Sequence, residues 1–228
     1  MTFRFFSSAV SSASARCFAM ISAARSPALI PRREASRCSR AIWISNFFAD
    51  MRAWDRLDPF RGRGAGGHVV SVQFPTSPLW SHMSVFPART YKKAHRHGPG
   101  AHVFAVTGTG YSLMWMEEGG EIERHAWHHG WVFAPPEDMF HQHFNTGATP
   151  ARYMAMSLGS HRYPVLSRKV ARKQNPELAI KDGGLQLDYE DQDPRIHRIW
   201  LAEMRQAGIE SRMGKYFDET RIAAEMGA

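Results

Sequence analysis

Histidines gather in the middle of this chain. Eight of the twelve lie between residues 95 and 143, and three of these stand in the segment HRHGPGAH, residues 95 to 102. Imidazole nitrogens suit Fe, Ni, Cu and Zn as ligands. Such a cluster therefore indicates a transition-metal site. Cysteine is excluded as a ligand, because Cys17 and Cys38 both lie near the N-terminus.

The alternation of side chains along a strand predicts which of these histidines meet. His95 and His97 are two residues apart, so on a strand they share one face. His141 and His143 have the same spacing on a later strand. His102 follows a Gly-Pro-Gly turn that can return it beside His97. We therefore expect two strands to line one cavity and to direct imidazoles toward one ion.

The segments that carry these histidines have the residue pattern of short strands separated by turns. We expect extended structure over 68–74, 82–97, 102–106, 111–116, 130–135, 140–145 and 151–158, with a hairpin over 117–127. Turn residues recur every roughly 8–12 residues, which favours an all-β sandwich or barrel. This pattern predicts a β-domain over residues 51–165.

The first 50 residues differ from this domain and predict a low-complexity or disordered extension. Residues 1–40 are rich in Ser, Ala and Arg and hold a net +6 of the chain's formal +8, which leaves only +2 for the other residues. Two interpretations stay open: a mitochondrial transit peptide, or sequence read through upstream of a start near Met51. We expect a cytoplasmic protein, or a mitochondrial one if the first interpretation holds.

The charge and hydropathy patterns also exclude two classes of partner. A nucleic-acid surface needs Lys and Arg on one face of the folded domain, and the charge excess lies outside that domain. No apolar run reaches the ~18 residues that a membrane span requires. We therefore expect a small-molecule substrate and neither a nucleic-acid nor a membrane partner.

Residues 166–228 predict a C-terminal extension with one helix at about 195–208. Ile196, Ile199, Trp200 and Met204 recur at helical spacing and form an apolar stripe. Asp193 can cap the start of this helix. We expect the helix to pack on the β-domain or in a dimer.

The first histidine segment resembles the first motif of the cupin superfamily. That motif reads His-x-His, three or four residues, Glu, and a later Gly. His95 and His97 match the pair, and His102 stands at the glutamate position. The later glycine, Gly108 or Gly110, is displaced by one residue.

The segment GWVFAPPEDMFHQHFN resembles the second cupin motif. Gly130, Pro136, His141 and Asn145 match it at the expected spacings. Asp138 stands where glycine is usual, at a turn position that tolerates positive φ. The two motifs occur in order, and the resemblance covers roughly residues 66–160.

This resemblance implies an all-β fold, a cupin double-stranded β-barrel (jelly roll) with the C-terminal helical extension, often a homodimer. It further implies a divalent metal held by His95, His97, His102 and His141. Four neutral ligands leave the ion its full charge and favour Fe(II), with Zn, Ni, Mn or Cu as alternatives. All-His iron sites of this kind resemble those of thiol dioxygenases and diketone-cleaving dioxygenases.

The leading functional hypothesis is therefore a non-haem Fe(II) dioxygenase acting on a small anionic or chelating organic substrate. We expect Lys93, Tyr91 or Arg152 to bind the substrate, and His143 and Tyr111 to move protons. Two alternatives stay open. One is a redox-neutral metal-dependent lyase, decarboxylase or isomerase, and the other is a ligand-binding cupin without turnover.

Overall fold

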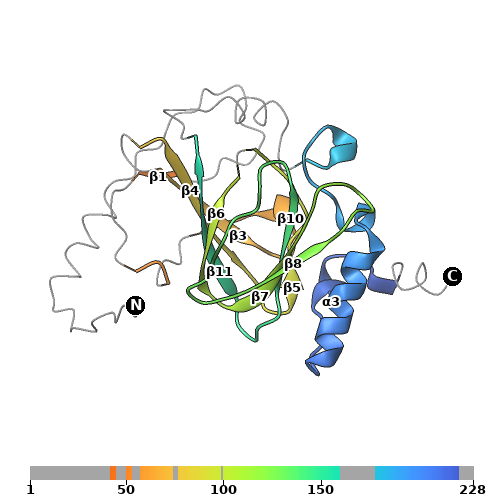
Figure 1. The fold of residues 1–228 in the computed structure, drawn as a ribbon. Helices are drawn as coiled ribbons and strands as arrows, with labels where there is room; N and C mark the ends of the chain where they lie inside the picture. The colour runs from red at the N-terminus through yellow and green to blue at the C-terminus, as the bar shows by residue number, and fades with distance from the viewer. Residues whose placement is uncertain are drawn as a thin grey trace, which may run out of the picture.

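Two β-sheets and one α-helix make up most of the computed structural model, which describes residues 42–44, 50–52, 57–73, 77–98, 100–159 and 178–220. The helix, α3, lies outside the smaller sheet (Figure 1). All pairings between the named strands are antiparallel except that of β1 with β3. A mainly β fold with a C-terminal helix is thus confirmed. Hydrogen bonds between the described strands leave two sheets and do not close them into one barrel.

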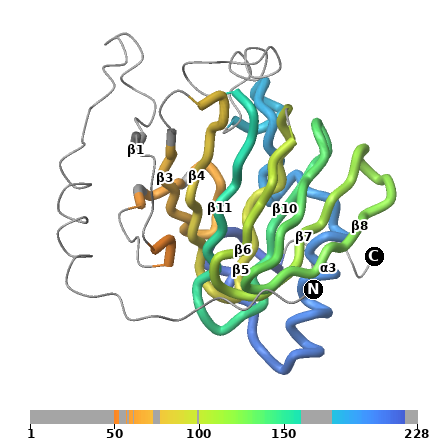
Figure 2. Tube along the Cα trace, turned by 60° about the vertical axis from the view of Figure 1, so that its left-hand side comes forward, coloured from red at the N-terminus to blue at the C-terminus, as the bar shows by residue number. Residues whose placement is uncertain are grey.

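The larger sheet has the strand order β1-β3-β4-β11-β6-β9, with β2 beside β3. Its members are β1 (Ile42–Ile44), β2 (Asp58–Pro59), β3 (His68–Gln73), β4 (Leu79–Phe86), β6 (His102–Thr107), β9 (Val132–Phe133) and β11 (Ala151–Leu158). The smaller sheet has the order β5-β10-β7-β8. Its members are β5 (Thr90–Tyr91), β10 (Phe140–Asn145), β7 (Thr109–Trp115) and β8 (Glu123–His128). Figure 2 shows β3, β4 and β11 side by side, and β10, β7 and β8 likewise.

The two sheets pack face to face through an apolar layer. Trp127 of the smaller sheet belongs to one buried cluster with Phe86, Val103 and Tyr153 of the larger sheet. Along β11, Ala151, Tyr153 and Ala155 are buried whereas the residues between them are half-buried. This period of two directs one face of the strand into the space between the sheets.

The helix α3 (Pro194–Gln206) covers the outer face of the smaller sheet. Its buried residues Ile196, Trp200 and Met204 join Tyr111 and Phe144 in the largest buried cluster of the described residues. The helix lies where the sequence predicted it. No helix in the described part of the chain is long and apolar enough to cross a membrane.

The N-terminal cap of α3 is also as the sequence predicted. The Asp193 carboxylate accepts a hydrogen bond from the Arg195 backbone nitrogen at 2.8 Å, and a proline occupies the first turn. Short 3₁₀ turns precede and follow the helix, and a further one precedes β3: η2 (Arg61–Arg63), η3 (Ile180–Asp182), η4 (Tyr189–Asp191) and η5 (Met213–Lys215). The C-terminal segment also packs on the smaller sheet, because Tyr189 of η4 and Met213 of η5 belong to the same buried cluster as α3.

Two expected boundaries differ in the structure. Residues 42–44, expected within the N-terminal extension, form β1 and pair with β3. Residues 1–41 and 45–49 of that extension, and residues 160–177 and 221–228, lie outside the described part of the chain. The long strand expected over 82–97 ends at Phe86, because a turn with positive φ at Arg89 precedes β5.

Candidate metal centre

Three histidines lie together between the sheets. One nitrogen of each of His95, His97 and His141 lies within 4.8 Å of the corresponding nitrogens of the other two. The ring of His141 is 4.2 Å from that of His95 and 5.0 Å from that of His97, centroid to centroid. His95 and His141 are buried and His97 is half-buried. Three imidazoles at this spacing can hold a divalent metal ion.

Backbone hydrogen bonds fix the two strand segments that carry this triad. His95 and His141 exchange backbone hydrogen bonds of 3.1 and 2.9 Å. The turn before β10 holds the third ligand, because the Asp138 nitrogen donates to the carbonyl oxygen of His97 at 3.2 Å. Asp138 has a φ of 58°, as expected for the position where cupins usually have glycine.

The donor set fits a metal in its orientation as well as in its spacing. The Nδ1 of His141 lies 3.0 Å from the carbonyl oxygen of Met139, and the Nδ1 of His95 lies 3.4 Å from that of Lys93. A carbonyl oxygen only accepts, so in each ring Nδ1 carries the hydrogen and Nε2 keeps its lone pair for an ion.

The electrostatic surroundings keep these imidazoles neutral. Burial lowers the pKa of His95 well below its usual value, and the charges of Arg63 and the neighbouring histidines lower it further. Burial and then the proximity of His97 do the same to the pKa of His141. Metal ligation requires the neutral form of histidine, and the protein provides it.

The structure does not bring His102 to this group. His102 is the first residue of β6 and its side chain is exposed, whereas Val103 beside it is buried. Neighbouring residues of a strand point to opposite faces, so His102 faces away from the triad. It lines an apolar groove on that side with Phe104 and Met156. Three of the four expected ligands are therefore together.

Tyr91 and Lys93 also lie on the opposite face from the one expected. Tyr91 pairs with Phe144, but His95 pairs with His141. Four steps along one strand thus match three along its neighbour. The extra residue is a β-bulge, which inverts the side-chain parity between Tyr91 and His95. Regular alternation, on which the expectation rested, does not hold across this segment.

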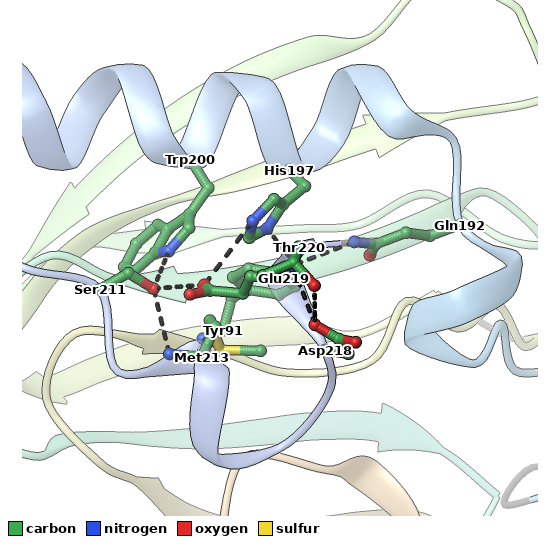
Figure 3. Close-up of polar contacts among 9 residues, drawn as sticks. All are labelled: Tyr91, Gln192, His197, Trp200, Ser211, Met213, Asp218, Glu219 and Thr220. Atoms are coloured by element: carbon green, nitrogen blue, oxygen red, sulfur yellow. Dashed lines mark hydrogen bonds and ion pairs between the residues drawn. The ribbon is translucent and has the colours of Figure 1, made fainter. Parts of the chain in front are cut away.

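Both side chains are engaged with the C-terminal segment. Figure 3 shows Tyr91 under α3, where its hydroxyl lies 2.8 Å from Nδ1 of His197 and accepts a hydrogen bond from Gln192 at 2.9 Å. The ammonium group of Lys93 forms an ion pair with Asp188 at 2.7 Å. The expected orientation of these two side chains is therefore corrected, since neither faces the triad, and their substrate-binding role stays a prediction.

Tyr111 and Arg152 are likewise placed away from the triad. Tyr111 stacks on Phe144 with ring centroids 4.6 Å apart and faces α3. Arg152 lies on the outer face of the larger sheet, where its guanidinium group donates to the carbonyl oxygen of Met51 at 3.0 Å. The neighbour of Tyr111 along β7, Ser112, does face the interior, and so does Tyr153, the neighbour of Arg152 along β11.

His143 faces the interior, as its spacing from His141 predicted. Its ring centroid lies 5.7 Å from that of His141. Trp127 donates to the Ser112 hydroxyl oxygen, which lies 2.8 Å from Nδ1 of His143 and can donate its own hydrogen there. Burial, followed by the charge of Lys92, lowers the pKa of His143 to about 3. The ring is therefore neutral near pH 7, and the same surroundings oppose its protonation.

Three interior residues were missed by reasoning from the sequence: Arg63, Lys92 and Tyr153. Arg63 and Lys92 are buried cations, 9% and 2% exposed. Tyr153 is in ring contact with His143, at 5.1 Å between centroids. The alternation of β11 could have indicated Tyr153, but the bulge hides Lys92, and Arg63 comes from a 3₁₀ turn with no strand pattern.

Comparisons with known proteins add little to this geometry. No family model matches the sequence, and no curated protein is similar to it. Among solved structures, the chain is similar to Bacillus subtilis oxalate decarboxylase, which is a cupin. One such structure, from work on the Mn(II) centres of that enzyme, has 15% sequence identity and a TM-score of 0.39, and the match covers 46% of this chain and 28% of that chain. Its structure at pH 4.6 matches with 15% identity and a TM-score of 0.37 over 43% and 26%. The chain spans little more than a quarter of those proteins, so the cupin resemblance rests on the two histidine motifs and the triad.

Proposed function

We propose that this chain is a metal-dependent enzyme that catalyses a redox-neutral reaction, of the lyase, decarboxylase or isomerase type, on a small anionic substrate. The observation that carries the proposal is the group of three buried or half-buried histidines with ligand atoms within 4.8 Å. Three imidazoles with a further position open for water or substrate are a donor set of catalytic zinc sites. Ni and Mn serve the same Lewis-acid role.

The residues around the triad support an anionic substrate. Arg63 is buried, and its positive charge contributes to the low pKa of both His95 and His143. This charge therefore acts on the interior where a ligand of the triad would lie. A bound ion would polarise a carbonyl or carboxylate oxygen of that ligand. The neutral His143 is held beside the triad through Ser112.

An Fe(II) dioxygenase is the second candidate. Its support is the neutrality of the whole donor set, since imidazole suits iron as well as zinc and no carboxylate is part of the triad. Oxygen uptake separates the two candidates, because the redox-neutral reaction consumes none.

The test is metal analysis of the protein purified without added metal, followed by a substrate screen. We expect about one equivalent of metal in the wild type and a loss of at least about tenfold in affinity for His97→Ala and His141→Ala. His102→Ala, at an exposed histidine of the larger sheet, is the matched control and should keep the metal. Unchanged metal content in both triad variants would contradict the proposal.

The screen then uses small carboxylic and keto acids, diketones and phenols, with product formation and oxygen consumption followed together. Turnover without oxygen uptake supports the redox-neutral reaction. Turnover with stoichiometric uptake supports the dioxygenase. Stoichiometric metal without turnover on any of these classes would favour the ligand-binding alternative.

A further inference from the structure

Lys92 is one of the largest fully buried side chains of the described residues, yet its polar partners carry no formal charge of their own. Its ammonium nitrogen donates to the Tyr153 hydroxyl at 3.1 Å and to the Ser84 hydroxyl. It also lies 5.0 Å from the ring centroid of Tyr153 and 5.4 Å from that of Phe86. A buried ammonium without a negative partner is strongly disfavoured. Its surroundings must therefore supply a negative charge or remove its proton.

Tyr153 is the partner that can supply that charge. Burial alone would raise the pKa of its hydroxyl, but the charge of Lys92 and hydrogen bonds from Lys92 and Ser84 outweigh burial, and the pKa is lowered. Burial lowers the pKa of Lys92 in turn. Loss of one proton from the two groups leaves either a phenolate beside an ammonium or a phenol beside an amine. Either form removes the isolated charge.

The pair lies next to the candidate metal centre. The ring of Tyr153 is 5.1 Å from that of His143, which is 5.7 Å from His141 of the triad. Tyr153 and His143 also line one cavity, about 10 Å³ in volume. The two side chains therefore border the same part of the interior, beside the triad.

We propose that Lys92 and Tyr153 form a proton-storing pair for the three-histidine site, in which the Lys92 ammonium stabilises a phenolate on Tyr153. The inference rests on the proposed function, because it assigns the pair to the reaction at the triad. Lys92 is the positioning residue. The charged and titratable side chains that face Tyr153 are Lys92, Arg63, His82 and His143.

The proton transfer is balanced without a further reactant. When a substrate enters as an acid, the phenolate oxygen takes its proton. The O–H or C–H bond of the substrate breaks, its electron pair stays on the substrate, and an O–H bond forms on Tyr153. The reverse transfer returns the proton to the product. No group is oxidised or reduced in either transfer, as the redox-neutral reaction requires.

The tyrosinate absorbance of the full-length, metal-free protein tests this pair. Burial raises the pKa of Tyr91, Tyr111 and Tyr189, which removes their absorbance from the range near and below about pH 10. We expect the wild type to show a tyrosinate transition below about pH 10 that belongs to Tyr153, read as its difference from Tyr153→Phe because Tyr163 and Tyr216 are present in both proteins. That transition should be absent from Tyr153→Phe, shifted to higher pH in Lys92→Met, and kept in Lys92→Arg.

Two results would overturn the pair: a low-pH transition that persists in Tyr153→Phe, or one that Lys92→Met leaves in place. Tyr153→Phe removes only a hydroxyl, so the wild-type minus Tyr153→Phe difference spectrum decides the matter even if Lys92→Met does not fold. Metal content is measured on the same preparations. Stoichiometric metal without the tyrosinate transition refutes only this inference, whereas the transition without metal refutes only the proposed function.

Discussion

At the residue scale, two glycines decide how closely the strands around the site approach. Gly108 has a φ of 94°, and a Cβ there would lie 2.8 Å from Ala151. A Cβ on Gly110 would overlap the carbonyl oxygen of Phe144 and approach the ring of Trp127 to 2.8 Å. Both positions therefore need a residue without a side chain. The sequence left open which of these two glycines belongs to the first motif. In the structure, Gly108 permits a positive φ beside Ala151, and Gly110 permits the close approach of β10.

Gly110→Ala should lower the thermal midpoint of unfolding strongly, because the backbone of β10 cannot yield as a flexible side chain would. We expect a loss of stability of at least about 2 kcal/mol, in the range of overpacked cores. Gly67→Ala is the control, since its Cβ would meet its nearest neighbours at ordinary distances of 3.4–3.5 Å. Equal midpoints for the two variants, measured by circular dichroism, would show that β7 and β10 are less closely packed.

At the element scale, α3 is the partner of the smaller sheet. Its buried face carries Trp200, whose indole nitrogen donates to the Ser211 hydroxyl at 2.9 Å (Figure 3). That hydroxyl in turn donates to Glu219 and accepts from the Met213 backbone nitrogen. The helix thus fastens the segment that follows it. Both lie over Tyr91, which keeps this tyrosine on the outer face.

The start of α3 depends on its capping residue. Asp193→Ala removes the hydrogen bond to the Arg195 nitrogen, so we expect the free energy of unfolding to fall by about 1 kcal/mol. Glu190→Ala, an exposed acidic residue shortly before the helix, is the control and should change stability by less than about 0.5 kcal/mol. Urea unfolding curves of both variants provide the measurement, and a cap variant as stable as the control would contradict this account.

At the scale of the whole molecule, neutral histidines buried at the core make the fold sensitive to acid. His197 is fully buried on the inner face of α3. Its Nε2 lies 3.6 Å from a Glu219 oxygen and has no hydrogen-bond partner among the described residues. Burial lowers the pKa of His197 to about 4. In the unfolded chain a histidine titrates near 6.5, so between these values the unfolded state binds a proton that the folded state does not.

This difference predicts that stability is lost as the pH falls. A proton bound only by the unfolded state makes unfolding more favourable, by up to roughly 3 kcal/mol between about pH 6.5 and 4. His197→Asn removes the titrating group, so the free energy of unfolding should depend less on pH over that range. His102→Asn, at an exposed position, is the control. Urea unfolding of the wild type and the two variants is measured at several pH values with a chelator present. The same dependence of the unfolding free energy on pH in all three proteins would refute the role of His197.

Much of this protein could be predicted from the order of its residues. Turn residues and alternating apolar positions indicated the strands, and the spacing of Ile196, Trp200 and Met204 indicated α3, because local periodicity is a property of the chain itself. The two histidine motifs predicted the three residues of the triad together with a fourth ligand, His102, and Asp138 predicted a turn with positive φ. Each of these depends on a few neighbouring residues.

Tertiary structure decided which side chains face the triad. A single bulge before His95 places Tyr91 and Lys93 outside and Lys92 inside, and it follows from how β5 pairs with a strand some 50 positions later. The exposed orientation of the His102 side chain and the buried position of Arg63 also depend on contacts between residues far apart in the sequence. Side-chain parity is inherited along a strand only while its register is unbroken. Register is set between strands, so the two motifs could indicate the three histidines that meet, but only the fold excluded His102 and determined which side chains surround the triad.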